Sequence, residues 1–311
     1  MDLSEIWLAI LTFGAAVVNG AVGYGFSSTI TPIAILWYSN KVLNPALVTV
    51  EVVVNVVMLL RVRAYARATW SRARPVVLTL FPGIVLGTIA LSYLAVNDVK
   101  LILYVVLLPL VALQLYGLSR PIRNERRGGA SIGPGIGFLY ALTTISGPPL
   151  ALFLRNQGLS NDEFRATIAQ IRVAESTLTL GTYAIATSFF GAGLFALPSL
   201  TLIPYLLIPA ILGVPLGIYL LRSVSPEFFR RFIMLVDAIF ISYGLSAVMA
   251  TLKWVSLETS YLVFAGLLAV IGVLAWASFR RWPAESIFDE PPGDAPAHGG
   301  SGSPPTGTGP P

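Results

Sequence analysis

Hydrophobic positions dominate this chain and fall into nine long runs that are separated by short polar stretches. Most of the runs approach the roughly 20 residues that a helix needs to cross a membrane. They cover residues 6–38, 43–60, 75–96, 99–118, 132–154, 167–190, 199–221, 228–251 and 258–279. The pattern predicts an all-α polytopic membrane protein. No basic stretch precedes the first run, so we expect it to be retained rather than cleaved.

Two of the runs are interrupted by small, hydroxyl-bearing and helix-breaking residues. The first interruption lies within residues 19–32 and the second within residues 143–149. In hydrocarbon, non-helical backbone persists only where protein buries it or where it lines a cavity. Paired breaks in the two halves of a chain are typical of the binding site of a secondary transporter. We therefore expect the two breaks to lie face to face and to form the site.

Each break is expected to separate two half-helices. In the first run, one half-helix covers residues 6–22, the break lies at Gly23-Tyr-Gly25, and the next half-helix begins at about Ser27. Ser27 or Ser28 is the expected cap, because a serine hydroxyl accepts from the free N–H groups of a first turn. In the second run, Ser146 stands just before Gly147 and two prolines, which is a strong helix-start signal.

The composition excludes several classes of function. Charged residues make up 11% of the chain, against about 25% in a soluble domain. The chain has no cysteine, and its one histidine, His298, lies in a segment rich in Pro and Gly. The hydrophobic runs therefore hold no candidate for thiol chemistry or for histidine-based metal binding. We expect no enzyme activity, no cofactor and no metal, and the scattered basic residues do not indicate nucleic-acid binding.

The distribution of arginines predicts how the chain crosses the membrane. If all nine runs cross, the basic residues divide almost evenly between the two sides. If the two interrupted runs instead return to the side on which they start, every loop arginine lies on one side. Only Lys41, Lys100 and Lys253 then lie on the other. The positive-inside rule favours this arrangement, which places the C-terminus in the cytoplasm and the N-terminus outside.

The same arrangement makes the chain an inverted repeat, in which each half has an interrupted hairpin and three crossings. Short matching words support it, among them the Gly-x-x-x-Gly motifs at 83–87 and 213–217, for which we expect a role in close helix packing. The predicted parts are a first transmembrane repeat (1–120), a cytoplasmic linker (121–131), a second repeat (132–252), an additional transmembrane helix (258–282) and a disordered Pro/Gly-rich tail (283–311).

Four ionisable residues lie inside the hydrophobic runs: Glu51, Arg172, Glu175 and Asp237. A charge at the bilayer centre costs about 2.5–3.5 kcal/mol on insertion scales, so each is a candidate functional residue. On a helix, Arg172 and Glu175 share one face with Ser176 and Thr179. Two readings stay open. Arg172 and Glu175 form an ion pair that holds helices together, or Arg172 binds an anionic substrate while Glu175 orients it or takes a proton.

Glu51 and Asn55 also share one helix face. Aligning the two halves places Asn55 opposite Glu175, so that each half contributes a polar stripe. Glu51 is expected either to accept a proton or to hydrogen-bond the broken backbone. For Asp237 we favour a role in helix packing.

The breaks are themselves suited to binding an anion. The N-terminus of a half-helix presents free N–H groups and the positive end of its dipole. The glycines allow close approach of the backbone and the hydroxyls add donors, although glycines can also serve helix packing alone. The predicted substrate-binding residues are Gly23, Gly25, Ser27, Ser28, Thr144, Ser146, Gly147 and Arg172. The predicted proton-coupling or orienting residues are Glu51, Asn55 and Glu175.

Over about residues 6–250, the order and spacing of several segments resemble the sulfite exporter TauE/SafE family of membrane transporters. These segments are Gly20-Ala-Val-Gly-Tyr-Gly-Phe26 with Pro32, Pro45-Ala-Leu-Val-Thr49 to Asn55, Arg63 to Trp70, Pro82-Gly83-x-x-x-Gly87, Arg165-Ala-Thr167 and Phe229-Arg-Arg231. The resemblance implies a bacterial-type inner-membrane carrier of small anions, often sulfur-containing ones such as sulfite or organosulfonates. Arg172 matches no family-wide motif, and the tail lies outside the family pattern.

Together these features predict a secondary transporter whose partners are a small anion and the lipid bilayer. Sulfur specificity rests on the resemblance, and proton coupling is left open. The alternatives are a membrane scaffold or assembly protein, which would tolerate the loss of Arg172, and an anion channel without coupled transport. The sequence also leaves open the oligomeric state, including a homo-oligomer, and the direction of transport.

Overall fold

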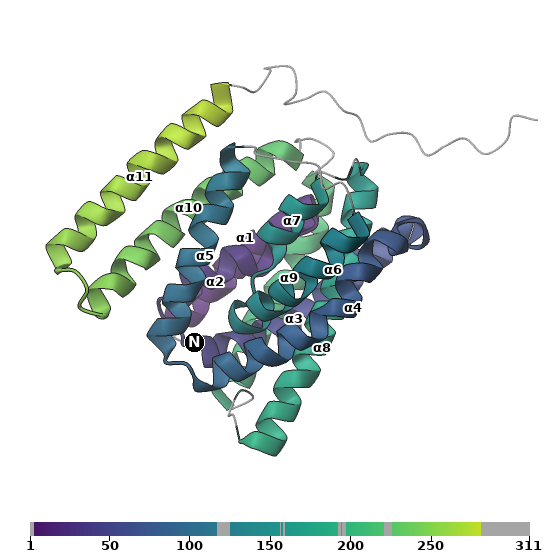
Figure 1. Cartoon of the computed structure of the whole chain (residues 1–311), viewed down its shortest axis with the longest axis horizontal. Coiled ribbons are helices and arrows are strands. Elements are labelled where there is room, and N and C mark those ends of the chain that lie inside the picture. Colours follow the sequence, from purple (N-terminus) through teal and green to yellow (C-terminus); the bar gives the residue numbers. More distant parts are fainter. Residues whose placement is uncertain are drawn as a thin grey trace, which may run out of the picture.

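The computed structural model describes residues 3–116, 125–155, 157, 159–191, 194, 197–220 and 226–280. In this part of the chain, all regular structure is helical (Figure 1). The helices are α1 (Leu3–Val22), α2 (Phe26–Ala34), α3 (Asn40–Arg61), α4 (Arg63–Tyr93), α5 (Val96–Tyr116), α6 (Glu125–Thr143), α7 (Gly147–Arg155), α8 (Asn161–Phe190), α9 (Leu197–Leu220), α10 (Pro226–Thr251) and α11 (Leu257–Arg280).

Both predicted breaks are present. α1 ends at Val22 and α2 begins at Phe26, while α6 ends at Thr143 and α7 begins at Gly147. In the first break, Gly23 and Gly25 have φ angles of 91° and 113°. Glycine is favoured there because a side chain is strained in this left-handed region.

The expected serine cap of α2 is wrong. The N-cap residue is Gly25, and no side chain makes a cap hydrogen bond. Ser27 lies within the first turn, and its hydroxyl is already engaged with Glu51 on α3. A true capping box opens α8 instead, where Ser160 and Glu163 exchange hydrogen bonds. The N–H of Ser160, donating to the Glu163 carboxylate, keeps the pKa of this surface group below its usual value.

The element order of α1–α5 is repeated in α6–α10. α7 begins and ends 121 residues after α2, and α8 begins 121 residues after α3. The packing follows the same exchange: α4 lies against α6 as α9 lies against α1, while α3 packs on α8 and α5 on α10. The two halves are therefore built alike. Their opposite orientation relative to a membrane stays a prediction.

Glycines on α4 and α9 allow the closest of these helix contacts. A Cβ added at Gly83 would overlap the carbonyl oxygen of Pro134 on α6, and one at Gly217 would overlap that of Val17 on α1. A Cβ added at Gly87 or Gly213 would also lie too close to the facing backbone, at 2.4 Å and 2.7 Å. The Gly-x-x-x-Gly motifs thus serve helix packing, as their small-residue spacing indicates.

We expect Gly83→Ala to destabilise the protein by about 1–3 kcal/mol, since overpacking forces backbone shifts. The measurement is thermal unfolding of the purified protein in detergent. Gly181→Ala on α8 is the matched control, because nothing lies within 4 Å of a Cβ added there. That control should be neutral or stabilising, since alanine favours a helix over glycine by about 1 kcal/mol. Equal stability of the two variants would refute the close-packing account.

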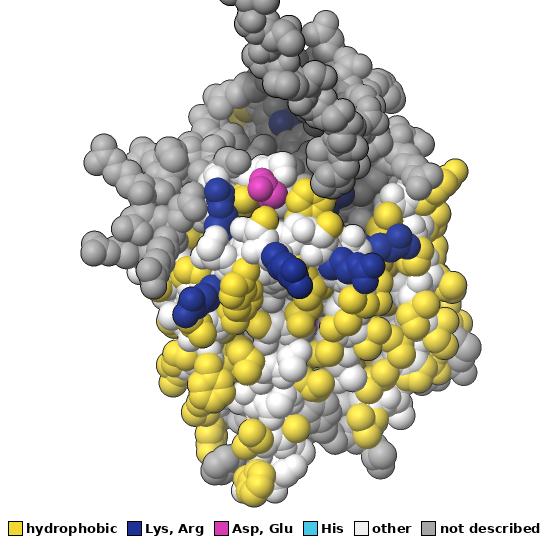
Figure 2. Space-filling model, turned by 90° about the vertical axis from the view of Figure 1, so that its right-hand side faces the viewer, with side chains coloured by type: hydrophobic (Ala, Val, Ile, Leu, Met, Phe, Trp, Pro, Cys, Tyr) yellow, Lys and Arg dark blue, Asp and Glu magenta, His cyan; other side chains and the backbone are white. Residues whose placement is uncertain are grey.

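The described helices identify the chain as an integral membrane protein. Seven of them are long and apolar enough to cross a membrane: α1, α3, α4, α5, α9, α10 and α11. α6 and α8 are not among them, although both lie in predicted hydrophobic runs. The polar stripe of α8 explains its lower hydropathy. In Figure 2, Lys and Arg side chains form a band, below which the surface is mainly hydrophobic and uncharged, as expected at a membrane boundary.

The predicted additional helix is present as α11, which packs against α10 and α5 at the edge of the bundle (Figure 1). α6 begins at Glu125, within the segment predicted as a linker. The predicted tail over 283–311 lies outside the described residues. The fold thus leaves the two breaks in the interior, between α3 and α8.

Candidate functional site

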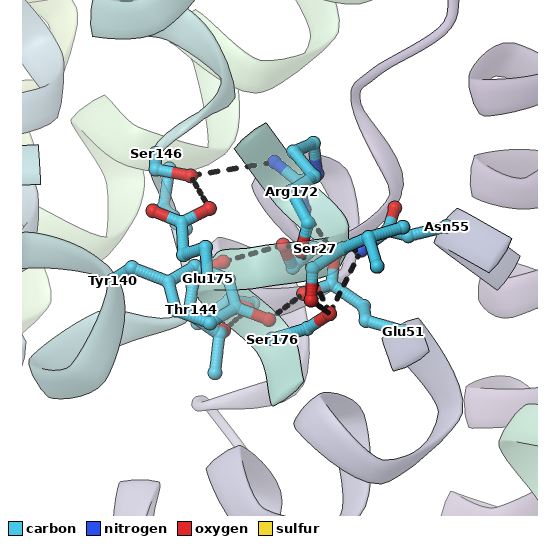
Figure 3. Close-up of polar contacts among 12 residues, drawn as sticks. Ser27, Glu51, Asn55, Tyr140, Thr144, Ser146, Arg172, Glu175 and Ser176 are labelled. Atoms are coloured by element: carbon cyan, nitrogen blue, oxygen red, sulfur yellow. Dashed lines mark hydrogen bonds and ion pairs between the residues drawn. The ribbon is translucent and has the colours of Figure 1, made fainter. Parts of the chain in front are cut away.

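The two helix breaks touch each other inside the bundle (Figure 3). The Ser27 hydroxyl donates to the carbonyl oxygen of Thr144 over 2.5 Å. The hydroxyls of Thr31 and Thr144 lie 2.9 Å apart. All three side chains are fully buried. The face-to-face placement expected from the sequence is therefore what the structure shows.

Thr144 is held in an unusual backbone conformation. Its φ angle is 62°, in a region where a β-branched residue is an outlier. Its N–H donates to the Tyr140 carbonyl, and its hydroxyl donates to the Thr143 carbonyl over 2.6 Å. That hydroxyl must then accept the bond from Thr31. Its counterpart 121 residues earlier is Gly23, which also has a positive φ. Such strain gathers at functional sites, which makes this break a candidate.

A buried ion pair joins the two halves beside the breaks. Nη2 of Arg172 on α8 bonds Oε1 of Glu51 on α3, and their side chains are 2% and 0% exposed. The two residues are 121 positions apart, so opposite charges stand at matching positions of the two halves. Of the two readings left open by the sequence, the one that pairs Arg172 with Glu175 does not hold: Arg172 pairs with Glu51 on α3, and Glu175 accepts from Ser146.

The Glu51 carboxylate is fully supplied with donors. Oε1 accepts from Arg172 and lies 2.8 Å from the Ser27 hydroxyl, whose one proton is shared between this oxygen and the Thr144 carbonyl. Oε2 accepts from the Tyr140 hydroxyl over 2.5 Å. The Tyr140 ring also lies under the guanidinium, with 5.8 Å between the Arg172 Cζ atom and the ring centre. Such bonds offset the cost of burying a charged pair.

The other two nitrogens of the Arg172 guanidinium, Nη1 and Nε, have weaker hydrogen bonding or none. The Ser146 hydroxyl donates to Oε2 of Glu175 over 2.6 Å and lies 3.5 Å from Nη1 of Arg172. Among the described residues, Nε of Arg172 and Oε1 of Glu175 are buried without a hydrogen-bond partner. Gly147 is adjacent, since a Cβ added to it would lie 3.5 Å from Nη1. Arg172 and Glu175 therefore each have a buried polar atom without a hydrogen-bond partner.

The remaining predicted residues lie around this network with less direct contacts. The Asn55 amide approaches the Arg172 carbonyl and the Ser176 hydroxyl at 3.4 Å each. The alignment of Asn55 with Glu175 is thus off by one residue, because α8 begins 121 rather than 120 positions after α3. Ser28 is buried on α2, but none of the network hydrogen bonds includes its side chain.

The glycines shape the first break rather than joining the hydrogen-bond network. Gly25 packs against Val18, and Gly23 packs against Arg165. Asp237 is buried on α10, which packs against α2, and it takes no part in the bonds around Arg172.

Two further residues hold the ends of the broken helices. The Asn44 amide donates to the Leu142 carbonyl near the end of α6, and the Arg165 guanidinium donates to the Ala21 carbonyl near the end of α1, each over 2.8 Å. The donors and the acceptors are again each 121 positions apart. Each half thereby clamps the break of the other half, and the site residues are buried in this arrangement.

Sequence reasoning missed Tyr140, Thr31 and both clamp residues. Tyr140 lies in the last turn of α6, four positions before Thr144 at the break. A tyrosine buried in a membrane helix needs a hydroxyl partner, and this was the available signal. Arg165 and Asn44 lie in the first turns of α8 and α3, where they look like ordinary interfacial residues.

The donors gathered here suit an anion. They are the Arg172 guanidinium, the hydroxyls of the breaks and the backbone N–H groups of the first turn of α2. α7 offers fewer of these, because Pro148 and Pro149 carry no N–H and only Gly147 remains. The described residues include no cluster of His, Cys, Asp and Glu that would hold a metal ion.

Comparison with known proteins identifies the family. A model of the family described as sulfite exporter TauE/SafE matches residues 8–244. The comparisons with curated proteins and with solved structures gave no match. The matched range includes both breaks, α3, α8 and the Arg172 site. The chain belongs to the sulfite exporter TauE/SafE family of membrane transporters.

Proposed function

We propose that this protein is a secondary transporter of a small sulfur-containing anion, sulfite or an organosulfonate, and that the anion binds between the two helix breaks. The family supports transport of sulfite or a related anion. The observation that carries the location is Arg172, a buried guanidinium beside two touching breaks, with one nitrogen unpartnered.

The chemistry of Arg172 fits this role. A guanidinium has five N–H donors in a rigid fork that matches the oxygens of an oxyanion. Glu51 occupies Nη2, and Nε on the same edge of the guanidinium is unpartnered. Nη1, on the other edge, has only the 3.5 Å contact to Ser146. An anion at Nη1 also meets the Ser146 hydroxyl and the backbone at Gly147. Burial strengthens such contacts, because the low dielectric of the interior screens charges weakly.

The alternative is that the Arg172–Glu51 pair has a structural role alone and holds α3 against α8. A structural pair needs its two charges and nothing more. It does not require the unpartnered Nε, the strained Thr144 or the convergence of two breaks on one guanidinium. These features favour a binding site, and anion transport is the property that separates the two readings.

We further propose that the protein resides in a bacterial-type inner membrane, with the C-terminus in the cytoplasm and the N-terminus outside. The arginine distribution supports this orientation. The chain lacks cysteine, so a cysteine introduced in place of Lys253 is a unique label. An impermeant thiol reagent should reach it from outside intact cells. Reaction only after the cells are opened would indicate the opposite orientation in the membrane.

The proposed function is tested with purified protein in liposomes. Labelled sulfite and ethanesulfonate are offered from one side, with and without unlabelled anion on the other. We expect uptake that saturates and that is accelerated by anion on the far side, as exchange requires. Flux that neither saturates nor shows exchange would indicate a channel. The absence of flux for both anions would overturn the proposal and favour a scaffold.

A further inference from the structure

The two buried carboxylates of the site differ sharply in their partners. Glu51 accepts from Arg172 and Tyr140 and shares the Ser27 proton with the Thr144 carbonyl. Glu175 accepts one hydrogen bond in the network, from Ser146 to Oε2, and its Oε1 is buried without a partner. Both side chains are fully buried. The same kind of group therefore has two very different environments around one guanidinium.

This difference decides which group holds a proton at lower cost. A buried carboxylate is stabilised by the donors that it accepts from, and an unpaired buried oxygen is costly. The Glu51 oxygens meet the Arg172 guanidinium, the Tyr140 hydroxyl and the shared Ser27 hydroxyl, so a proton added there would disturb bonds already made. A proton on Oε1 of Glu175 would neutralise that group and break none of the bonds present.

The charge of the cluster requires such a proton once an anion arrives. Among the buried described residues of the network, Arg172 is the one cation and stands against two carboxylates. Nη1 of Arg172 lies 3.5 Å from the Ser146 hydroxyl, which is also the donor to Glu175. An anion bound there would lie beside the Glu175 carboxylate and compete with it for Ser146. Two like charges so close, without water between them, repel strongly.

We propose that Glu175 is the residue that binds the coupled proton, so that anion and proton are carried together. The proton comes from water on the side from which the anion binds, adds to the carboxylate of Glu175, and leaves when the anion leaves. No bond other than this O–H bond forms or breaks. This inference rests on the proposed function, and it specifies which residue makes the transport of the anion responsive to pH.

The ionisable groups that face Glu175 are consistent with this role. They are Arg172 on the same helix, Glu51 from α3 and Tyr140 from α6. α7 presents Gly147 and two prolines at its start, next to the Ser146 donor. The ionisable side chains of α4, which also packs on α8, lie in its first turns and at Tyr93 near its end. Glu175 therefore responds mainly to one cation, one carboxylate and the arriving anion.

The test compares the wild type with Glu175→Gln in liposomes, using labelled sulfite. Two assays are made on each protein: anion exchange at equal pH on both sides, repeated over a range of pH, and accumulation driven by a pH gradient. Wild type should show pH-dependent exchange and gradient-driven accumulation. Glu175→Gln, whose amide mimics the protonated acid, should exchange with a flattened pH dependence and lose at least tenfold in accumulation. Since sulfite itself titrates, the proteins are compared at the same pH.

Glu163→Gln is the matched control, because Glu163 lies on the same helix but in the surface capping box. It should behave as the wild type. Accumulation retained by Glu175→Gln would overturn the assignment, and so would a Glu51→Gln variant that alone shows uncoupled exchange. If a pH gradient does not drive accumulation in the wild type, proton coupling is refuted, while anion transport itself is retained. No wild-type exchange would remove both.

A second measurement does not depend on the folding of a variant. Ethanesulfonate, which stays ionised over the whole range, is added to purified wild-type protein in a weakly buffered solution with a pH-sensitive dye. We expect the protein to take up protons as the anion binds. Binding with no proton uptake would contradict the role of Glu175.

Discussion

Replacement of Arg172 by glutamine is expected to abolish anion transport and to destabilise the protein. The substitution removes the one buried cation of the network and leaves Glu51 and Glu175 buried without a counter-charge. Removing one partner of a buried pair typically costs about 3–5 kcal/mol. Each lost hydrogen bond to a charged group would add about 1.5–3 kcal/mol to the binding deficit. Thermal unfolding in detergent and sulfite flux in liposomes measure the two effects.

Arg172→Lys is the informative control for this variant. It keeps a positive charge between the carboxylates, so most of the stability should remain. It loses the planar fork that bonds two oxygens at once, and transport should still fall by about 10- to 100-fold, the equivalent of one charged hydrogen bond. Normal flux in a folded Arg172→Gln protein would remove Arg172 from the site.

Glu51→Gln is expected to make the protein depend on its anion for stability. The variant leaves Arg172 without its direct partner, although Glu175 and Ser146 remain nearby. We expect a loss smaller than that of Arg172→Gln. Added sulfite should then stabilise the variant more than the wild type, because the guanidinium is no longer neutralised by Glu51 and attracts the anion more strongly. A ligand at 100 times its Kd stabilises by about 2.7 kcal/mol.

The comparison needs a control for general salt effects. Glu258→Gln, at the exposed start of α11, should respond to sulfite as the wild type does. Chloride at equal ionic strength should not rescue Glu51→Gln. If sulfite does not change the unfolding temperature of Glu51→Gln, Arg172 and Glu51 form a structural pair only.

Much of this fold could be predicted from the sequence. The hydrophobic runs give the helices, and the bilayer allows few other structures. The first break was placed correctly at residues 23–25, because two glycines so close together in a hydrophobic run favour an interruption of the helix. The cap was not, since Ser27 has a stronger use as a donor to Glu51. The polar face predicted for residues 172–179 is present on α8, where all four of its side chains are buried.

The site could be predicted in its residue types but not in its pairings. Arg172 and Glu175 share a helix face, so their ion pair was the local expectation. The structure pairs Arg172 with Glu51, 121 residues away, because the two halves bring matching positions together. Sequence spacing reports neighbours on one helix and says little about neighbours across a bundle. Tyr140 was missed for the same reason, since its role depends on Glu51 from the other half.

The most direct test of the anion site is the binding of labelled sulfite to purified protein, with wild type beside the double variant Glu51→Gln and Arg172→Gln. The double variant removes both charges of the pair, so neither of the two is left buried without its partner. A loss of binding in this folded variant therefore reports the site rather than the fold. We predict saturable binding to the wild type and none to the double variant. Undiminished binding to the double variant would contradict the placement of the anion at Arg172.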